Sequence, residues 1–209
     1  GYGDLGCYNR DSKIPTPHLD RLATSGMRFT DSHSPSSVCS PTRYALVTGR
    51  YAWRTRLQRG VLGPWSPPLI APDQLTVAAL LKQHGYATGC IGKWHLGHRH
   101  EHLPLRHGFD SYYGIPYSND MQPTLLMRDD TVIENPVDQT TLTARYTAEA
   151  VSFIRQHRDS PFFLYLAHNF PHTPLFASAE FKGKSRRGLY GDVVEELDAS
   201  VGQMLATLA

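Results

Sequence analysis

Apolar residues recur at helical spacing in five stretches of the chain, and most of these stretches begin or end on a recognisable signal. In the first, Thr16-Pro17 can start a helix and Gly26 can end it. The last has the clearest apolar stripe. Three acidic residues are expected to stay off that stripe: Glu195, Glu196 and Asp198. The pattern predicts helices over these ranges: 16–26, 40–49, 76–85, 146–157 and 193–208.

Two short apolar runs, 86–91 and 161–167, are predicted to be strands. Helices that alternate with such strands indicate an α/β layer structure. Each strand runs into a polar loop that carries histidine, at 92–95 and at 168–172. Because ligands bind beyond the carboxyl ends of strands in open α/β sheets, we expect both loops to border one site. The region 119–142 has no readable pattern.

The composition narrows the class of partner. The chain has 209 residues, with 21 basic and 19 acidic side chains and a net charge of +2, and this balance argues against nucleic acid as a partner. No apolar run is long enough to span a membrane, and no signal-peptide pattern is present. The three cysteines, Cys7, Cys39 and Cys90, allow at most one internal disulfide.

Cys39 stands directly before the Ser40-Pro41 pair that starts the second predicted helix, and Arg43 follows one turn later. The positive end of the helix dipole and a guanidinium both favour an anion at this place, either a thiolate or a bound oxyanion. The alternative is a buried structural cysteine beside a surface arginine. The Cys-x-Pro-x-Arg spacing alone does not separate these interpretations.

Several further motifs accompany it in a fixed order along the chain. They are Gly1-Tyr2-Gly3-Asp4-Leu5-Gly6, Thr16-Pro17-His18-Leu19-Asp20-Arg21-Leu22, Gly92-Lys93-Trp94-His95-Leu96-Gly97, Gly114-Ile115-Pro116-Tyr117-Ser118 and Phe162-Phe163-Leu164-Tyr165 through His172. Together with Cys39 to Arg43, this set resembles the type I, formylglycine-dependent sulfatases. The segments Gly97-His98-Arg99 and His107-Gly108-Phe109-Asp110 are similar to the branch that contains arylsulfatase A and N-acetylgalactosamine-6-sulfatase.

The resemblance implies a fold and a reaction. The fold would be an alkaline-phosphatase-like sulfatase core of the α/β class, with a mixed, mostly parallel sheet flanked by helices. The reaction would be the hydrolysis of a sulfate ester through a covalent formylglycine–sulfate intermediate. The substrate would be a sulfated small molecule or glycan. A formylglycine-generating enzyme would be a second partner, and the family's secretory route would place the protein in the periplasm, the lysosome or outside the cell.

The resemblance also assigns roles to residues. Cys39 would become the formylglycine and, in that form, one ligand of a divalent cation, either Ca²⁺ or Mg²⁺. Arg43 would hold the formylglycine oxygens, and Lys93 would bind sulfate oxygens. His95 would accept a proton during sulfate release. Ser118 would form a hydrogen bond to the formylglycine or to the sulfate. His172 would bind sulfate close to the leaving oxygen and help to protonate that oxygen.

The remaining metal ligands of the family have no counterpart in the chain. Residues 1–209 are therefore expected to be part of an N-terminal catalytic domain, truncated at both ends, that lacks the first metal-binding strand and the C-terminal part. Such a fragment is expected to be inactive alone. Three carboxylates that could be taken for metal ligands are expected to have structural roles: Asp4, Asp110 and Asp192.

Three alternatives remain open at this stage. The first is a phosphonate monoester or phosphodiester hydrolase of the same superfamily. The second is a non-catalytic homologue that binds sulfated glycans. The third is a zinc-binding module built on the dense histidine stretch 98–107, although the spacing there is irregular.

Overall fold

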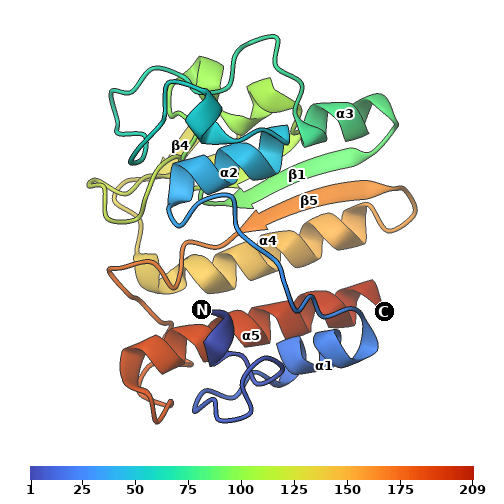
Figure 1. Ribbon diagram of the computed structural model, residues 1–209, viewed down its shortest axis with the longest axis vertical. Helices are drawn as coiled ribbons and strands as arrows, with labels where there is room; N and C mark the ends of the chain where they lie inside the picture. Colours follow the sequence, from blue (N-terminus) through green and yellow to red (C-terminus); the bar gives the residue numbers. More distant parts are fainter. The chain divides into compact units, whose positions relative to one another are not determined.

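The two apolar runs form neighbouring parallel strands in the computed structural model, which describes residues 1–209. β1 (Ala87–Gly92) pairs with β5 (Phe162–Ala167) over its whole length. β2 (Ser111–Gly114) runs parallel to β1 on its other side. β3 (Leu126–Arg128) and β4 (Thr131–Glu134) extend the sheet as an antiparallel hairpin, giving the order β4-β3-β2-β1-β5 (Figure 1).

Five α-helices accompany the sheet. Their bounds are α1 Pro17–Ser25, α2 Cys39–Thr48, α3 Val77–Gln83, α4 Leu142–Gln156 and α5 Gly188–Leu208. Each covers a predicted helix, and α4 and α5 start about one turn earlier than the sequence predicts. One short 3₁₀ segment precedes α1, and four lie between the α-helices. They are η1 Tyr2–Asp4, followed by η2 Ala52–Arg54, η3 His100–His102, η4 Pro104–His107 and η5 Gln139–Thr141. No helix is both long and apolar enough to cross a membrane.

The chain divides into two compact units, each made of separate segments. Unit 1 comprises residues 1–32, 138–155 and 169–209. Unit 2 comprises residues 33–137 and 156–168, and it contains the whole sheet together with α2 and α3.

The core of unit 2 forms around the central strands. Its buried members come from α2, from β1 and β2, and from the irregular segment 52–70. Trp94, directly after β1, is fully buried in this core and packs edge-on against Phe109. Asp110 fixes the start of β1, because its carboxylate accepts hydrogen bonds from the backbone N–H and the hydroxyl of Thr88, both at 2.9 Å. This carboxylate is structural, as the sequence predicts.

In unit 1, α1 packs beside α5 (Figure 1), and a buried carboxylate connects them. Asp198 is 2% exposed and accepts hydrogen bonds from the backbone N–H groups of His18 and Leu19, at 3.1 and 2.8 Å. It thereby satisfies two unpaired donors in the first turn of α1 and complements the helix dipole. Glu196 is also buried and accepts from the N–H of Ser178 at 3.0 Å.

The sequence places Glu196 and Asp198 off the apolar stripe of α5, and the structure shows that both are nevertheless buried. Both carboxylates are buried because backbone N–H groups of other segments need acceptors there. Asp192, on the same helix, accepts from the N–H groups of Gly183 and Ser185, each at 2.8 Å. Asp192 is thus structural, as expected.

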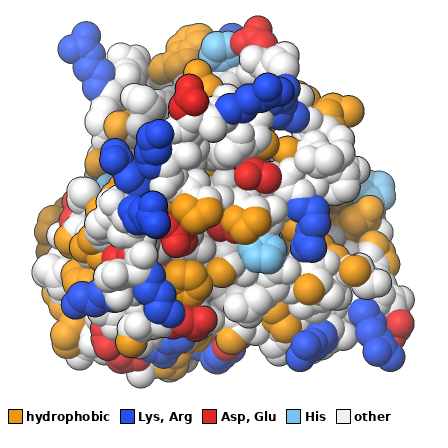
Figure 2. All heavy atoms as spheres, turned by 90° about the horizontal axis from the view of Figure 1, so that it is seen from below, with side chains coloured by type: hydrophobic (Ala, Val, Ile, Leu, Met, Phe, Trp, Pro, Cys, Tyr) orange, Lys and Arg blue, Asp and Glu red, His pale blue; other side chains and the backbone are white.

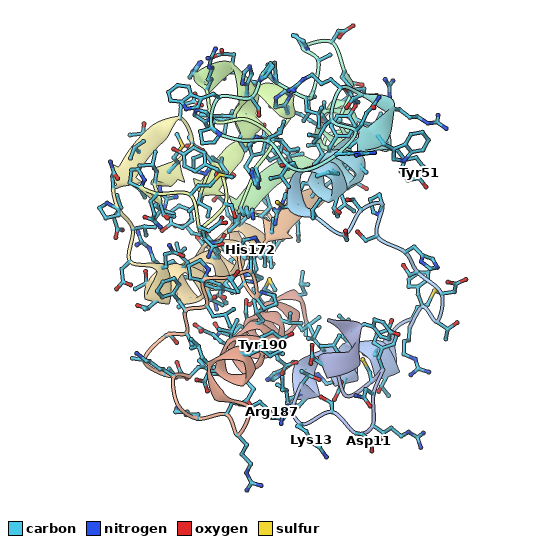
Figure 3. The ribbon with its side chains drawn as sticks, turned by 60° about the vertical axis from the view of Figure 1, so that its left-hand side comes forward. Asp11, Lys13, Tyr51, His172, Arg187 and Tyr190 are labelled. Carbon is cyan, nitrogen blue, oxygen red and sulfur yellow. The ribbon has the colours of Figure 1, made fainter.

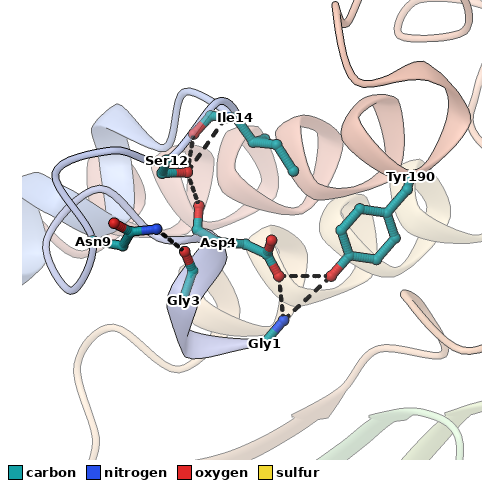
Figure 4. A network of polar contacts seen from close by, with 7 residues as sticks. All are labelled: Gly1, Gly3, Asp4, Asn9, Ser12, Ile14 and Tyr190. Atoms are coloured by element: carbon teal, nitrogen blue, oxygen red, sulfur yellow. Dashed lines mark hydrogen bonds and ion pairs between the residues drawn. The ribbon is translucent and has the colours of Figure 1, made fainter.

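Asp4 belongs to a small polar network in unit 1 (Figure 4). Its carboxylate accepts a hydrogen bond from the Tyr190 hydroxyl at 2.8 Å. The Ser12 hydroxyl donates to the Asp4 carbonyl at 2.5 Å. Asp4 therefore connects η1 to α5, which is the structural role predicted for it. The network involves no cluster of acidic residues.

Charged side chains of both signs lie among apolar and uncharged ones on the face of the molecule seen in Figure 2. The picture agrees with the near balance of 21 basic and 19 acidic residues. A broad surface of one sign, such as a nucleic-acid-binding protein presents, is not visible on this face.

Candidate active site

Cys39 is the first residue of α2, and no side chain caps the helix there. The N-cap residue, Val38, is extended, and its side chain has no hydrogen-bond acceptor. The N–H groups of the first helical turn therefore keep their positive character at Cys39. Cys39 is partly exposed and is a free cysteine, as are Cys7 and Cys90. The position suits a group that becomes anionic.

Arg43 lies one helical turn after Cys39, on the same face of α2. Its guanidinium donates a hydrogen bond to the main-chain carbonyl of Lys93, in the segment that follows β1. The fixed cation thus ties the start of α2 to the carboxyl end of β1. The sequence predicts that these two regions meet, and the structure brings them together.

The segment after β1 is held from both sides. The N–H of Lys93 donates to the carbonyl of Ala167 at the end of β5, at 2.8 Å. The N–H groups of Trp94 and His95 donate to the carbonyls of Ile115 and Pro116, just beyond β2, at 3.0 and 3.1 Å. These bonds fix the backbone so that Trp94 fills the core between the two polar side chains.

Gly92 makes this close approach possible. Its φ is +105°, and a Cβ at this position would lie 2.1 Å from the carbonyl oxygen of Ala167. No other residue type can occupy the turn without displacing β5. The glycine of the Gly-Lys-Trp-His motif is therefore required by the backbone.

Lys93 is 1% exposed, and its ammonium donates to the hydroxyl of Ser118 at 2.8 Å. Burial lowers the pKa of Lys93 to about 8; the charge of Cys39 opposes this shift and that of Arg43 adds to it. The ammonium carries three donors, and Ser118 accepts from one of them. A buried cation of this kind is stabilised by an anion placed beside it.

His95 is 3% exposed and has φ of +57°, a left-handed conformation that is uncommon for a residue with a Cβ. Its Nε2 lies 2.8 Å from the carbonyl oxygen of Leu62. Burial, and then the neighbouring Lys93, lower the pKa of His95 to about 4, so the ring is neutral at pH 7. A neutral ring that faces a carbonyl through Nε2 carries its proton there, and Nδ1 is left as a base.

The Nδ1 atom of His95 is buried and has no hydrogen-bond partner in the protein. A buried acceptor without a donor is unfavourable unless another group supplies one. Backbone strain at the same residue is typical of functional sites. His95 is therefore prepared to accept a proton from a group that enters the site.

Leu62 connects the two sides of the site through its peptide groups. Its N–H donates to the hydroxyl of Ser40 at 3.1 Å, and its carbonyl faces His95. Ser40 is fully buried in the first turn of α2. The sequence gives no indication of these contacts, because backbone atoms have no residue-type signature. Ser40 and Leu62 are positioning residues that the sequence analysis missed.

Two further residues near the site were also missed. Asp120 acts electrostatically on Lys93 and His95, raising the pKa of both. The pKa of Tyr165 on β5 is raised by burial, and the charge of Arg43 opposes the shift. Asp120 falls in a region without periodicity, and Tyr165 has the only hydroxyl on an otherwise apolar strand.

His172 belongs to unit 1, whereas the residues described so far belong to unit 2. It lies in the loop that follows β5 (Figure 3), and its Nδ1 is 2.6 Å from the carbonyl oxygen of Thr173. A role for His172 beside Cys39 and Lys93 stays a prediction.

The residues of the chain do not form a cage for a divalent cation. No group of three or more histidine, cysteine, aspartate or glutamate side chains converges in a way that could hold a metal. Within the histidine stretch 98–107, each ring has a separate partner. His98 packs against Tyr117, His100 pairs with Asp130 at 3.2 Å, and the ring of His107 stacks on Trp94.

Comparison with known proteins identifies relatives over the whole chain. A family profile described as Sulfatase matches residues 1–209. Bovine (Bos taurus) arylsulfatase A is 41% identical and matches 100% of this chain and 46% of its own length. Dog (Canis lupus familiaris) N-acetylgalactosamine-6-sulfatase is also 41% identical, over 100% of this chain and 44% of its own length. The chain spans less than half the length of these two relatives.

Solved structures show the same fold. A Bacteroides thetaiotaomicron structure, described under the metabolism of multiple glycosaminoglycans, matches with a TM-score of 0.91 and 30% identity over 100% of this chain and 56% of its own. The protein Ps i-CgsB, in complex with k-i-k-neocarrahexaose, matches with a TM-score of 0.85 and 32% identity over 100% and 52% of the two chains. The phosphonate monoester hydrolase of Agrobacterium radiobacter, at 15% identity, shares the fold alone.

Proposed function

The chain belongs to the sulfatase family, and from this premise we propose that it forms the nucleophile-bearing and sulfate-binding part of a sulfuric ester hydrolase. The observation that carries the proposal is the group around Lys93. A buried ammonium, a neutral histidine with a free Nδ1 and a cysteine at a helix start are brought together by backbone contacts. Sulfate esters are the substrates that the family implies.

Cys39 is proposed to be the precursor of formylglycine. As its hydrate, this group would supply one hydroxyl that displaces the alcohol from the sulfur of the ester, and a second that, on losing its proton, would release sulfate and restore the aldehyde. The start of α2 suits such a group, because its uncapped N–H groups stabilise oxygen anions. Arg43 fixes the start of the helix against Lys93 and adds a positive charge.

Lys93 and Ser118 are proposed to bind the sulfate oxygens. The Lys93 ammonium already donates to the Ser118 hydroxyl at 2.8 Å, and its other donors remain for an anionic ligand. An ammonium held in a buried site stabilises the charge that develops on the transferred group more strongly than it would in water.

His95 is proposed to hold the proton that must be removed for sulfate to leave. Its Nε2–H is engaged by Leu62, so the proton goes to Nδ1, the atom that has no partner in the protein. Because its pKa is about 4, the ring is in the basic form at neutral pH. His172 is proposed to bind sulfate close to the leaving oxygen.

A divalent cation, Ca²⁺ or Mg²⁺, is implied by the family, but the residues of this chain do not provide its cage. Residue 39, as formylglycine, would be one ligand, and the others would come from parts of the protein outside residues 1–209. We therefore expect the 209-residue chain, as part of an N-terminal catalytic domain, not to hydrolyse aryl sulfates alone. A formylglycine-generating enzyme is the second proposed partner, and a secretory location is proposed from the family.

The first test is chemical. The chain is produced together with a formylglycine-generating enzyme, and the peptide that contains Cys39 is analysed by mass spectrometry. Conversion lowers the peptide mass by about 18 Da, from the exchange of a thiol for an aldehyde. Cys39→Ser is the control that this enzyme is expected to leave unmodified. A thiol that persists at Cys39 under these conditions would contradict the proposed catalytic function.

The second test is kinetic and uses the parent protein that contains residues 1–209. We expect hydrolysis of an aryl sulfate to exceed that of an aryl phosphate diester, and Lys93→Ala to lower kcat/KM for the sulfate by at least about a hundredfold. Arg158→Ala, at an exposed position, is the control. A preference for the phosphate diester would favour the phosphodiesterase alternative, and binding of sulfated sugars without turnover would favour a non-catalytic homologue.

A further inference from the structure

A pocket of about 450 Å³ lies at the C-terminal end of α2, away from Cys39. It is lined by Ser34 and Pro35 on one side and by Leu46, Arg50 and Tyr51 on the other, all in unit 2. None of its lining residues belongs to the candidate active site. The residues of α2 and its C-cap that line the pocket, from Ala45 to Gly49, lie roughly 9 to 15 Å from Cys39 along the helix.

Tyr51, at the edge of this pocket, is half of an exposed aromatic stack. The rings of Tyr51 and Trp53 are 5.4 Å apart at an angle of 23°, yet the two residues are 49% and 54% exposed. The guanidinium of Arg54 lies over the Trp53 ring, 5.1 Å from its centroid. Figure 3 shows Tyr51 at the surface, pointing away from the body of the chain. Each ring packs on the other, so less conformational entropy is lost when a ligand binds to them.

The chain segment that contains Arg50 and Tyr51 is rich in arginine, and Asp31 and Asp73 stand on either side of it. Residues 32–72 contain five arginines and no aspartate or glutamate. Two of the five have structural partners, because Arg43 donates to the Lys93 carbonyl and Arg56 to the Pro68 carbonyl. Arg50, Arg54 and Arg59 have no carboxylate partner. Planar guanidinium groups bind sulfate and carboxylate oxygens in pairs, so these side chains can recognise an anionic ligand.

We infer that this pocket and the Tyr51–Trp53 stack form a binding surface for a sulfated sugar chain, one that carries sulfate groups besides the one hydrolysed. The inference rests on the proposed function. One face of a pyranose ring consists of C–H groups and packs on an aromatic ring. The sulfate groups of the sugar accept hydrogen bonds from arginine side chains. A polymer with several sulfates can reach both ends of α2, whereas a small aryl sulfate cannot.

The test measures binding, with a carrageenan hexasaccharide as the probe and its desulfated, neutral form as the comparison. We expect Arg50→Gln with Arg54→Gln, and separately Tyr51→Ala with Trp53→Ala, to raise Kd for the sulfated probe at least tenfold in isothermal titration calorimetry. Tyr51→Phe retains the stack and should bind like the wild type. All four side chains are exposed, so the fold is expected to persist, and circular dichroism checks this.

The controls come from unit 1. Tyr2→Ala removes an exposed aromatic ring that also packs on a tyrosine, and Arg186→Gln removes an exposed arginine. Neither should change Kd. Wild-type affinity in both double variants would overturn the inference, as would equal binding of the desulfated probe. Binding of single-stranded DNA through the same four residues, at least as tight as that of the sulfated sugar, would identify a nucleic-acid surface instead.

The two proposals can fail separately. If the parent protein does not hydrolyse aryl sulfates but the hexasaccharide binds with the stated pattern, the proposed function is wrong and this surface stands. If aryl sulfates are hydrolysed and the four substitutions leave Kd unchanged, the surface is wrong and the proposed function stands.

Discussion

At the scale of single residues, the chemistry of the site depends on which nitrogen of His95 carries the proton. The contact from Nε2 to the Leu62 carbonyl fixes this, and burial keeps the ring neutral. The proposed base is therefore oriented by a main-chain carbonyl, whereas many catalytic histidines are oriented by a carboxylate.

Nuclear magnetic resonance of the chain with ¹⁵N-labelled histidine tests this arrangement. We expect the His95 ring to show the Nε2–H tautomer and to remain neutral from pH 8 down to pH 5, because its pKa is about 4. His95→Gln identifies the signal. A ring that titrates near pH 6.5, the ordinary value for histidine, would show that the His95 ring is accessible to water and would contradict its burial.

The sequence predicts part of this site and necessarily misses the rest. The residue types of Cys39, Arg43 and Lys93 carry a recognisable pattern, and the structure brings them together with Ser118. The contributions of Leu62 and Ser40 could not be predicted, because one acts through its peptide group and the other through a hydroxyl of the kind found on any helix. The orientation of His95 follows from these contacts.

At the scale of elements, the site is built by the turn that ends β1. That turn places polar side chains at positions 93 and 95 while Trp94 enters the core, and it lies between the ends of β5 and β2. The close approach leaves no room for a Cβ at Gly92. Backbone contact on both sides gives the site its rigidity.

Gly92→Ala is expected to lower the free energy of unfolding by about 3 kcal/mol or more, because the added Cβ would meet the Ala167 carbonyl at 2.1 Å. Gly85→Ala is the matched control. Gly85 also has a positive φ, +80°, but nothing lies within 4 Å of its added Cβ, so only the backbone cost of about 1 kcal/mol is expected. Chemical denaturation measures both, and equal losses would contradict the argument.

The helices and the strands β1 and β5 could be predicted from the sequence, because helix caps and apolar runs are local signals. The β3–β4 hairpin could not. Its turn contains Asp129 at a φ of +53°, where a glycine would have been a recognisable sign, and β4 has mostly exposed side chains. The burial of Glu196 and Asp198 on α5 could not be predicted either, because burial of a carboxylate depends on donors from distant segments.

At the scale of the whole molecule, the two units are interleaved along the chain. Unit 1 consists of residues 1–32, 138–155 and 169–209, and unit 2 consists of residues 33–137 and 156–168. Neither unit corresponds to a continuous stretch of sequence, so a boundary between them could not be predicted from composition. Unit 2 carries the candidate site and three histidines whose pKa is lowered by burial of the ring: His95, His107 and His168.

We expect the chain to lose stability in mild acid. Burial lowers the pKa of each of these histidines from 6.5 to about 4. The unfolded chain therefore binds more protons between these values, and each histidine contributes stability that is present above pH 6.5 and lost as the pH falls through 4. The loss is on the order of 3 kcal/mol per histidine at most.

Denaturant unfolding at pH 7 and at pH 4.5 measures this loss. His107→Gln should show a smaller decrease than the wild type, since it removes one group that titrates, while His84→Gln at the surface is the control. Equal decreases in the two variants would contradict the role of His107. The substitution also removes the stacking of His107 on Trp94, so the comparison is between pH values within each variant.

The pairing of β1 with β5 has a consequence for synthesis of the protein. The backbone of Lys93 is held by the carbonyl of Ala167, which emerges from the ribosome long after Cys39. At ordinary rates of translation the interval is on the order of ten seconds. During that time the segment around Cys39 lacks its final neighbours and stays open to an enzyme. Closure of the sheet ends that interval, so the order of synthesis would give the proposed modifying enzyme time to act on Cys39.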